Sequence, residues 1–126
     1  MPRFVILSAH RAERNTHANA EAHRTLGDQL RALRLFPLPV RGCYTHQDGT
    51  TVVEDSYLVP IKDDGNEVSA LLSVAEVYGQ ESILLDTDGE GQLVFLPSGN
   101  RQPLGRRTPG ISENYTSTPL GEFHYE

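Results

Sequence analysis

The chain has 126 residues, of which 37% are hydrophobic, and it carries a formal net charge of −6 at pH 7. One domain of this length buries roughly two-thirds of its unfolded surface, and the low apolar content leads us to expect that oligomerisation completes part of the core. The negative charge argues against nucleic-acid binding, which needs a basic surface, and the apolar runs are shorter than the ~20 residues that cross a bilayer.

The cysteine content and the N-terminal residues bear on the cellular compartment. Cys43 is the single cysteine of the chain, so it cannot form an intramolecular disulfide, which fits a reducing environment. The sequence does not begin with a basic segment followed by an apolar run, the pattern of a signal peptide. We therefore expect a cytoplasmic protein.

The first half of the chain alternates between strand and helix patterns. Residues 3–9, RFVILSA, have the length and apolar character of a strand. Asn15 or Thr16 can cap a helix that runs to about Arg34. The segments VRGCYT and TVVEDSYLVPI then predict two strands, joined at Asp48-Gly49, which is a strong hairpin signal.

The second half predicts one more helix and two more strands. The helix runs from about Glu67 to Tyr78 and ends at Gly79, and the strands SILLDT and QLVFL follow. The order β-α-β-β-α-β-β predicts an α+β fold: a ferredoxin-like split βαβ core whose antiparallel sheet carries both helices on one face. We expect residues 1–97 to form this domain. Residues 98–126, rich in Pro, Gly, Ser and Thr, should form an extended tail packed on the same domain, with GEFHYE as a short terminal strand.

An acid pair lies in the middle of the third predicted strand, where charged residues are unfavourable. Strand alternation places Glu54 and Asp55 on opposite faces, with Ser56 on the same face as Glu54. One interpretation is a solvated sheet face, and the other is a carboxylate presented to a cleft. Tyr44 on the preceding strand should pair near residues 53–55, within reach of Glu54. A carboxylate beside an aromatic ring suits a cationic ligand.

Other common sites have no support in the sequence. The phosphate-binding pattern GxxxxGK[ST] does not occur, and Cys43 has no obvious neighbouring base that would make it a nucleophile. The histidines do not have the spacing of metal ligands; they are His10, His17, His23, His46 and His124. We therefore expect no metal and no other cofactor.

Several short motifs occur in an order that resembles a known enzyme family. They are FVILSAHR at residues 4–11, NAEAHR at 19–24, LRA at 30–32, GCY at 42–44, Glu54, GQE at 79–81 and PLG at 119–121. The chain resembles the phage-encoded enzymes that degrade S-adenosylmethionine, long called hydrolases and later reinterpreted as lyases. Here the segment between GCY and the glutamate is one residue shorter than in that family. A second, uncharacterised bacterial family shares part of this pattern, but GCY favours the phage enzymes.

The resemblance implies a specific activity and site. The family forms PII-like homotrimers on a ferredoxin-like core and binds substrate at subunit interfaces. Its members would cleave S-adenosylmethionine to 5′-methylthioadenosine and homoserine lactone through attack by the substrate's own carboxylate. This activity would counter host restriction enzymes that need the metabolite. By this resemblance Glu54 and Tyr44 are the catalytic residues. We expect substrate contacts from Ser8, Ala9, Arg11 and Ser56, although Arg11 could equally be a surface residue.

Three other functions remain open from the sequence. The enzyme could be a hydrolase that yields homoserine, with Glu54 as the general base for water. It could be a PII-like trimer that binds an adenine nucleotide without turnover. It could also be an interaction protein that blocks a host restriction system or the host methionine adenosyltransferase. If the chain is phage-encoded, its location would be the host cytoplasm.

Overall fold

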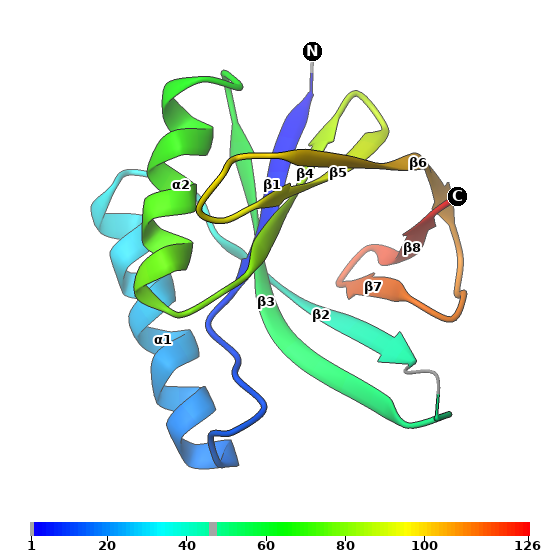
Figure 1. The fold of residues 1–126 in the computed structure, drawn as a ribbon, viewed down its shortest axis with the longest axis horizontal. Coiled ribbons are helices and arrows are strands. Elements are labelled where there is room, and N and C mark those ends of the chain that lie inside the picture. Colours follow the sequence, from blue (N-terminus) through cyan, green and yellow to red (C-terminus); the bar gives the residue numbers. More distant parts are fainter. Residues whose placement is uncertain (1, 46–47) are drawn as a thin grey trace.

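The computed structural model describes residues 2–45 and 48–126, which form two helices and eight strands. The path of the chain is shown in Figure 1. In chain order the elements are β1 (Arg3–Ser8), α1 (Thr16–Ala32), β2 (Leu38–Thr45), β3 (Thr51–Ile61), α2 (Asn66–Val77), β4 (Ser82–Thr87), β5 (Glu90–Phe95), β6 (Arg101–Pro109), β7 (Tyr115–Thr118) and β8 (Gly121–Tyr125). Neither helix is long and apolar enough to cross a membrane.

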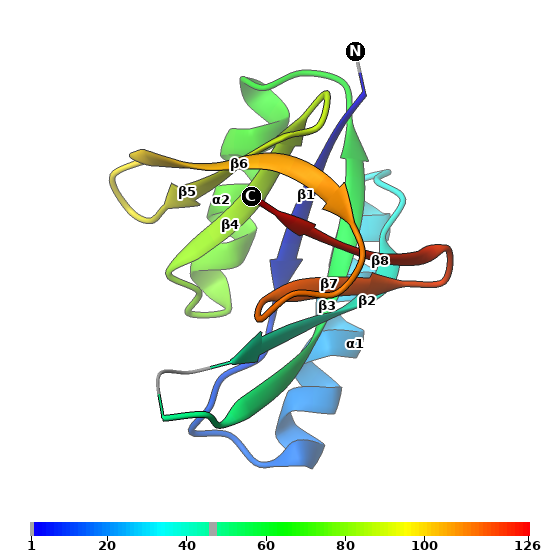
Figure 2. The same ribbon diagram turned by 90° about the vertical axis from the view of Figure 1, so that its right-hand side faces the viewer.

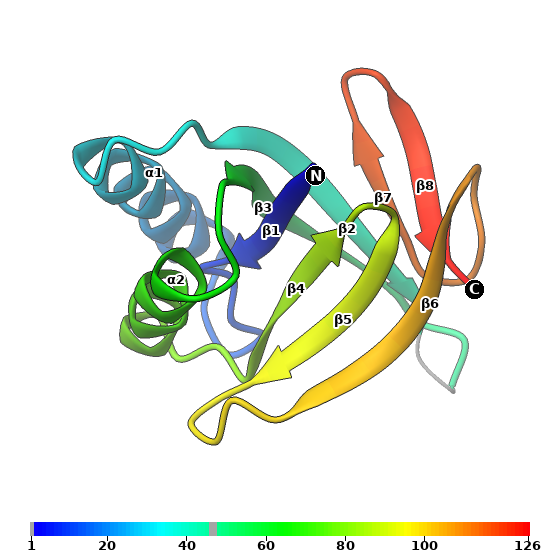
Figure 3. The same ribbon diagram turned by 90° about the horizontal axis from the view of Figure 1, so that it is seen from above.

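The strands close into an antiparallel barrel in the order β1-β3-β2-β7-β8-β6-β5-β4, and β4 pairs with β1. Figure 3 shows this ring, with both helices outside it. The prediction of a ferredoxin-like split βαβ core is therefore wrong. That fold would leave one sheet face open, whereas here β5 to β8 continue the sheet around until its edges meet, so the described strands leave no free edge.

The segment predicted as a tail supplies three of these strands. β6 pairs with β5 and then with β8, and β7 pairs with β2, which joins the end of the chain to its middle. Figure 2 shows β6 curving from one side of the barrel to the other. The pairing of β5 with β6 shifts register next to Gly91, and Gly105 has φ +97°, so the strand bends here at low cost. The predicted terminal strand GEFHYE is confirmed as β8.

The main apolar core lies between the outer wall of the barrel and the two helices. Leu26 and Leu30 of α1 and Leu71 of α2 are fully buried there against Val5 and Val59. Both helix predictions are confirmed within two residues, and the Asn15 side chain caps α1 by accepting a hydrogen bond from the Ala18 backbone N–H at 2.8 Å. Because alternate strand residues face this core, the residues between them face the barrel interior.

Candidate active site

A cavity of about 480 Å³ occupies the interior of the barrel. Its volume falls within the range of about 300–1,000 Å³ typical of small-molecule sites. All eight strands contribute to its wall, together with one neighbouring residue, Asn114. The lining consists of Ile6, Ser8, Tyr44, Glu54, Ser56, Ser82, Ile83, Leu84, Leu93, Leu104, Asn114, Tyr115, Thr116, Phe123, His124 and Tyr125.

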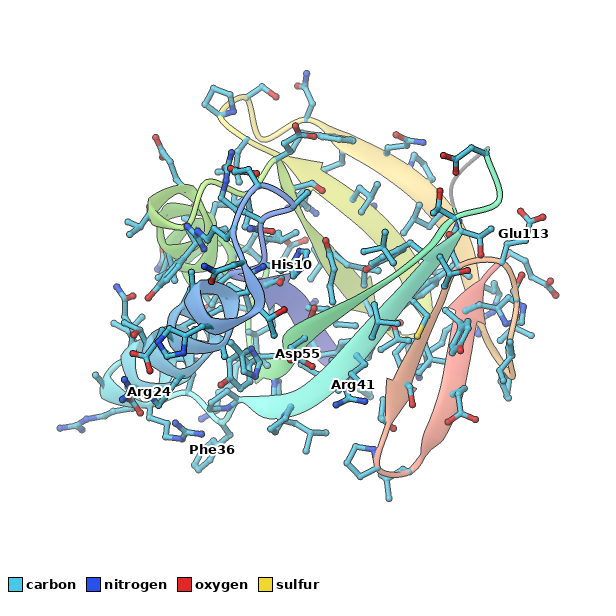
Figure 4. All side chains as sticks on the ribbon, turned by 90° about the horizontal axis from the view of Figure 1, so that it is seen from below. His10, Arg24, Phe36, Arg41, Asp55 and Glu113 are labelled. Carbon is cyan, nitrogen blue, oxygen red and sulfur yellow. The ribbon has the colours of Figure 1, made fainter. Side chains whose placement is uncertain are left out.

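Glu54 enters this cavity because β3 alternates its side chains across the barrel wall. Glu54 and Ser56 line the cavity, while Asp55 lies on the outside and pairs with Arg41 of β2 at 3.3 Å. Figure 4 shows Asp55 and Arg41 close together on the two neighbouring strands. The prediction that the two acids face opposite sides is confirmed, and Glu54 is the one on the inner face.

Tyr44 reaches the same part of the wall by folding back over a glycine. Gly42 is the residue of β2 directly opposite Glu54, and Tyr44 is opposite Val52. A Cβ atom on Gly42 would lie 2.5 Å from the Tyr44 hydroxyl and 2.8 Å from its ring, so the missing side chain makes room for the phenol. The predicted register was one residue off, since Tyr44 does not pair with residues 53–55. The segment between β2 and β3 spans residues 46–50, of which 46 and 47 lie outside the described residues.

The Tyr44 hydroxyl stays protonated at neutral pH. Burial, and secondly the negative charge of Glu54, raise the pKa of Tyr44 to about 12, although 38% of the residue surface remains exposed. The hydroxyl end of the ring lies over Gly42. Tyr44 can therefore donate a hydrogen bond into the cavity, but it cannot serve as a base near pH 7.

His10 also approaches Glu54, and the sequence analysis did not assign it to the site. Its Nδ1 lies 3.1 Å from Oε1 of Glu54. This nitrogen is buried and makes no regular hydrogen bond to any described residue, so the short contact with Glu54 is its nearest polar interaction. The sequence feature that could have identified His10 is its position two residues after a strand, because loops at strand ends often present functional side chains.

The other predicted substrate-binding residues divide into two groups. Ser8 and Ser56 line the cavity. Ala9 is fully buried in the apolar core. Arg11 pairs with Glu13 of its own loop and donates a hydrogen bond to the carbonyl of Gly79, just after α2, at 2.6 Å. The structure thus brings Glu54, Tyr44 and the two serines together, whereas Ala9 and Arg11 do not line the cavity.

A buried polar network lies behind the cavity wall at Tyr125. Asp86 is 1% exposed and accepts hydrogen bonds from the Tyr125 hydroxyl at 2.7 Å, the Arg107 guanidinium at 3.2 Å and the Gly89 N–H at 2.9 Å. Burial and the bond to Asp86 raise the pKa of Tyr125 far above its ordinary value. The Arg107 guanidinium also lies over the ring of Phe4, 5.3 Å from its centroid. Asp86 pairs with Phe4 near the start of β1, whereas Ser56 pairs with Ser8 at its end, so this network and Glu54 lie toward opposite ends of the barrel.

The charge of the lining indicates the kind of ligand. Glu54 is the one acidic residue among the described lining residues, and none of those residues is lysine or arginine. A partly enclosed carboxylate beside the Tyr44 ring favours a ligand with a positive charge. Most of the remaining wall is apolar or hydroxyl-bearing, which suits a ligand with both ring and polar groups.

Comparison with protein families gives a match that covers nearly the whole chain. The model described as the S-Adenosylmethionine lyase family matches residues 5–125. The matched range includes all eight strands except the first two residues of β1, and it includes every residue of the cavity wall.

Proposed function

Since the chain belongs to the S-adenosylmethionine lyase family and is an enzyme that acts on S-adenosylmethionine, we propose that it binds and cleaves this substrate in the barrel cavity. One observation carries the proposal: Glu54 and Tyr44 line the same cavity, and the Tyr44 hydroxyl lies over Gly42, the residue that pairs with Glu54. The described lining of this cavity holds no other carboxylate and no lysine or arginine. S-adenosylmethionine carries a sulfonium and an α-ammonium, so its charges complement this wall.

The proposed reaction uses groups that the substrate already contains. The methionyl carboxylate attacks the γ-carbon and forms the C–O bond of homoserine lactone. The bond from the γ-carbon to sulfur breaks, and its electron pair leaves with sulfur as neutral 5′-methylthioadenosine. No water is activated and no proton is transferred in this step. The protein must mainly hold the methionyl arm bent, and well-oriented intramolecular reactions reach effective molarities of about 10⁵ M or more.

The chemistry assigns Glu54 to the α-ammonium of the substrate. A carboxylate against the sulfonium would stabilise a charge that disappears in the transition state and would therefore slow the reaction. A carboxylate on the α-ammonium stabilises a charge that persists throughout. It also draws the amino end toward β3, which leaves the substrate's carboxylate free to turn back on its own chain.

Tyr44 acts as a hydrogen-bond donor at the same end of the substrate. Its raised pKa keeps the proton on the phenol, so the hydroxyl can hold a polar group of the methionyl arm without accepting a proton. Ser56 lies on the same face of β3 and provides a further hydroxyl for this end. The Ser8 hydroxyl already donates to the carbonyl of Asp55, so toward the substrate it can act only as an acceptor.

The apolar part of the wall favours the reaction by excluding water. Ile6, Leu84, Leu93, Leu104 and Phe123 line the cavity beyond the polar end. The reaction merges a carboxylate and a sulfonium into neutral products, so a medium of low polarity stabilises the transition state relative to the more polar ground state.

Product analysis in ¹⁸O-labelled water tests the proposal. The purified protein is incubated with S-adenosylmethionine and samples are followed by mass spectrometry over time. We expect methylthioadenosine and unlabelled homoserine lactone to appear first, with labelled homoserine forming later as the lactone opens. Homoserine that carries the label from the earliest time point, without lactone, would show hydrolysis instead. Binding without any product would favour a nucleotide-binding protein.

Assembly and biological purpose stay predictions from the family resemblance. We propose a homotrimer with the site next to a subunit interface. Phe36 and Leu120 are 82% and 96% exposed, which supports a further contact surface, and Figure 4 shows Phe36 pointing away from the ribbon. Light scattering measures the assembly. Loss of restriction in bacteria that express the chain tests the proposed purpose, and co-purification tests the methionine adenosyltransferase as a partner.

A further inference from the structure

The loop that follows β1 holds His10 in a defined place. The backbone N–H of His10 donates to the Ser8 hydroxyl at 2.9 Å, and that hydroxyl donates to the backbone carbonyl of Asp55, also at 2.9 Å. On the other side, the Gln80 side chain donates to the backbone carbonyl of His10 at 2.9 Å. The backbone of His10 is thereby tied to β1, to β3 and to the segment between α2 and β4.

These ties direct the imidazole toward Glu54. Nδ1 lies 3.1 Å from Oε1 of Glu54, and the two side chains are 21% and 29% exposed. Nδ1 itself is buried and has no other polar partner among the described residues. The contact lacks regular hydrogen-bond geometry in the free chain, and catalytic contacts in unliganded enzymes commonly align only when substrate binds.

Two side chains from different parts of the chain therefore approach the part of the wall that holds Glu54. The Tyr44 hydroxyl approaches from β2 over Gly42, and His10 approaches from the end of β1. His10 does not line the cavity, whereas Glu54 and Tyr44 do. A role for His10 in the reaction would therefore be exerted through Glu54.

We propose that His10 is a positioning residue for Glu54, an inference that rests on the function proposed above. In the tautomer that carries its proton on Nδ1, His10 donates to Oε1 of Glu54 and fixes the carboxylate. The second carboxylate oxygen then faces the cavity and receives the α-ammonium of the substrate. Without His10 the Glu54 side chain would sample several rotamers, and the substrate would lose its bent orientation.

Three variants at this position separate positioning from structural support. His10→Ala removes the imidazole. His10→Asn places an amide nitrogen on Cγ, where Nδ1 is attached, and His10→Gln places it one atom further out. We expect His10→Ala to lower kcat/KM for methylthioadenosine release by about 10- to 100-fold, since small misplacements of reacting groups cost up to about 10²-fold. His10→Asn should recover most of the loss, and His10→Gln should not.

The same change in a Glu54→Gln background completes the test. If His10 acts through Glu54, His10→Ala should have little further effect there, because the coupling is lost with the carboxylate. Three outcomes would overturn the inference. They are an equal loss of kcat/KM from His10→Ala in the parent and in Glu54→Gln, a wild-type kcat/KM for His10→Ala, and equal recovery of activity by His10→Asn and His10→Gln. Wild-type activity of Glu54→Gln would instead overturn the proposed function. If circular dichroism shows that His10→Ala does not fold, the inference is tested by His10→Asn and His10→Gln alone, and higher activity of His10→Asn supports it.

Discussion

The substitution Glu54→Gln removes one charge from the cavity and keeps the shape of the side chain. In the proposed complex Glu54 accepts a charged hydrogen bond from the substrate α-ammonium, and such bonds contribute about 1.5–3 kcal/mol. The Glu54 side chain is only 29% exposed, so solvent screens this interaction less than it would at the surface. At about 1.4 kcal/mol per tenfold change, the expected loss is roughly 10- to 150-fold in kcat/KM.

The neighbouring acid provides a matched control. Asp55→Asn removes the same charge one residue along β3, but this side chain lies outside the barrel and pairs with Arg41. Both are exposed enough that the pair contributes little to stability. We therefore expect Asp55→Asn to retain wild-type turnover, with both variants keeping the thermal midpoint of the parent.

The assay follows methylthioadenosine release by liquid chromatography across a range of S-adenosylmethionine concentrations. If kcat/KM decreases in Glu54→Gln and not in Asp55→Asn, the Glu54 carboxylate contributes to the reaction. Activity of Glu54→Gln within threefold of the parent, which is about 0.65 kcal/mol, would falsify the role of Glu54. An equal loss of activity in Asp55→Asn would do the same, because a general effect of negative charge would then explain the data.

Three further predictions concern the residues around the cavity. Tyr44→Phe should lower turnover, and the pH–rate profile of the parent should show no Tyr44 ionisation near neutrality, because the pKa of Tyr44 is raised to about 12. An unfolded tyrosine ionises near pH 10, so only the unfolded state loses this proton between pH 10 and 12. The free energy of unfolding should therefore be independent of Tyr44 below pH 10 and decrease between pH 10 and 12. Urea titration should show a smaller decrease over this range in Tyr44→Phe. Gly42→Ala should reduce activity to a similar extent as Tyr44→Phe, because the added Cβ would displace the phenol; full activity would show that the ring position is unimportant. Asp86→Ala should lower the free energy of unfolding measured by urea titration by about 1–3 kcal/mol, because it leaves the Tyr125 hydroxyl without its buried acceptor. The Arg107 side chain is 38% exposed, so its charge stays hydrated and adds little to this cost. An unchanged free energy of unfolding would contradict the role of this network.

Local patterns in the sequence predicted most of the elements. Asn15 before an apolar stripe indicated the start of α1, and Gly79 indicated the end of α2, where its φ of +69° suits glycine. The Asp48-Gly49 signal correctly joined β2 to β3, and Gly49 has φ +85°. These features depend on near neighbours in the chain, so a single sequence contains the information for them.

The closure of the barrel could not be predicted in the same way. β6 contains Pro103, Gly105 and Pro109, which indicate loops rather than strands, and β7 is only four residues long. These strands form because backbone groups far apart in the chain pair with one another, and such pairing leaves little trace in side-chain pattern. Asp86 and His10 were missed for the same reason, since their partners Tyr125 and Glu54 lie 39 and 44 residues away in the sequence.

The sequence by itself determined that Glu54 and Asp55 lie on opposite faces of one strand, and that GCY precedes them on its hairpin partner. It also contained the motifs that relate the chain to enzymes acting on S-adenosylmethionine. Only the tertiary structure decided which of the two acids faces a cavity. The alternation of side chains along a strand assigns residues to two faces but does not show which face points into the barrel. Here the two helices cover the face that carries Asp55, and strands distant in the sequence close the barrel around the face that carries Glu54.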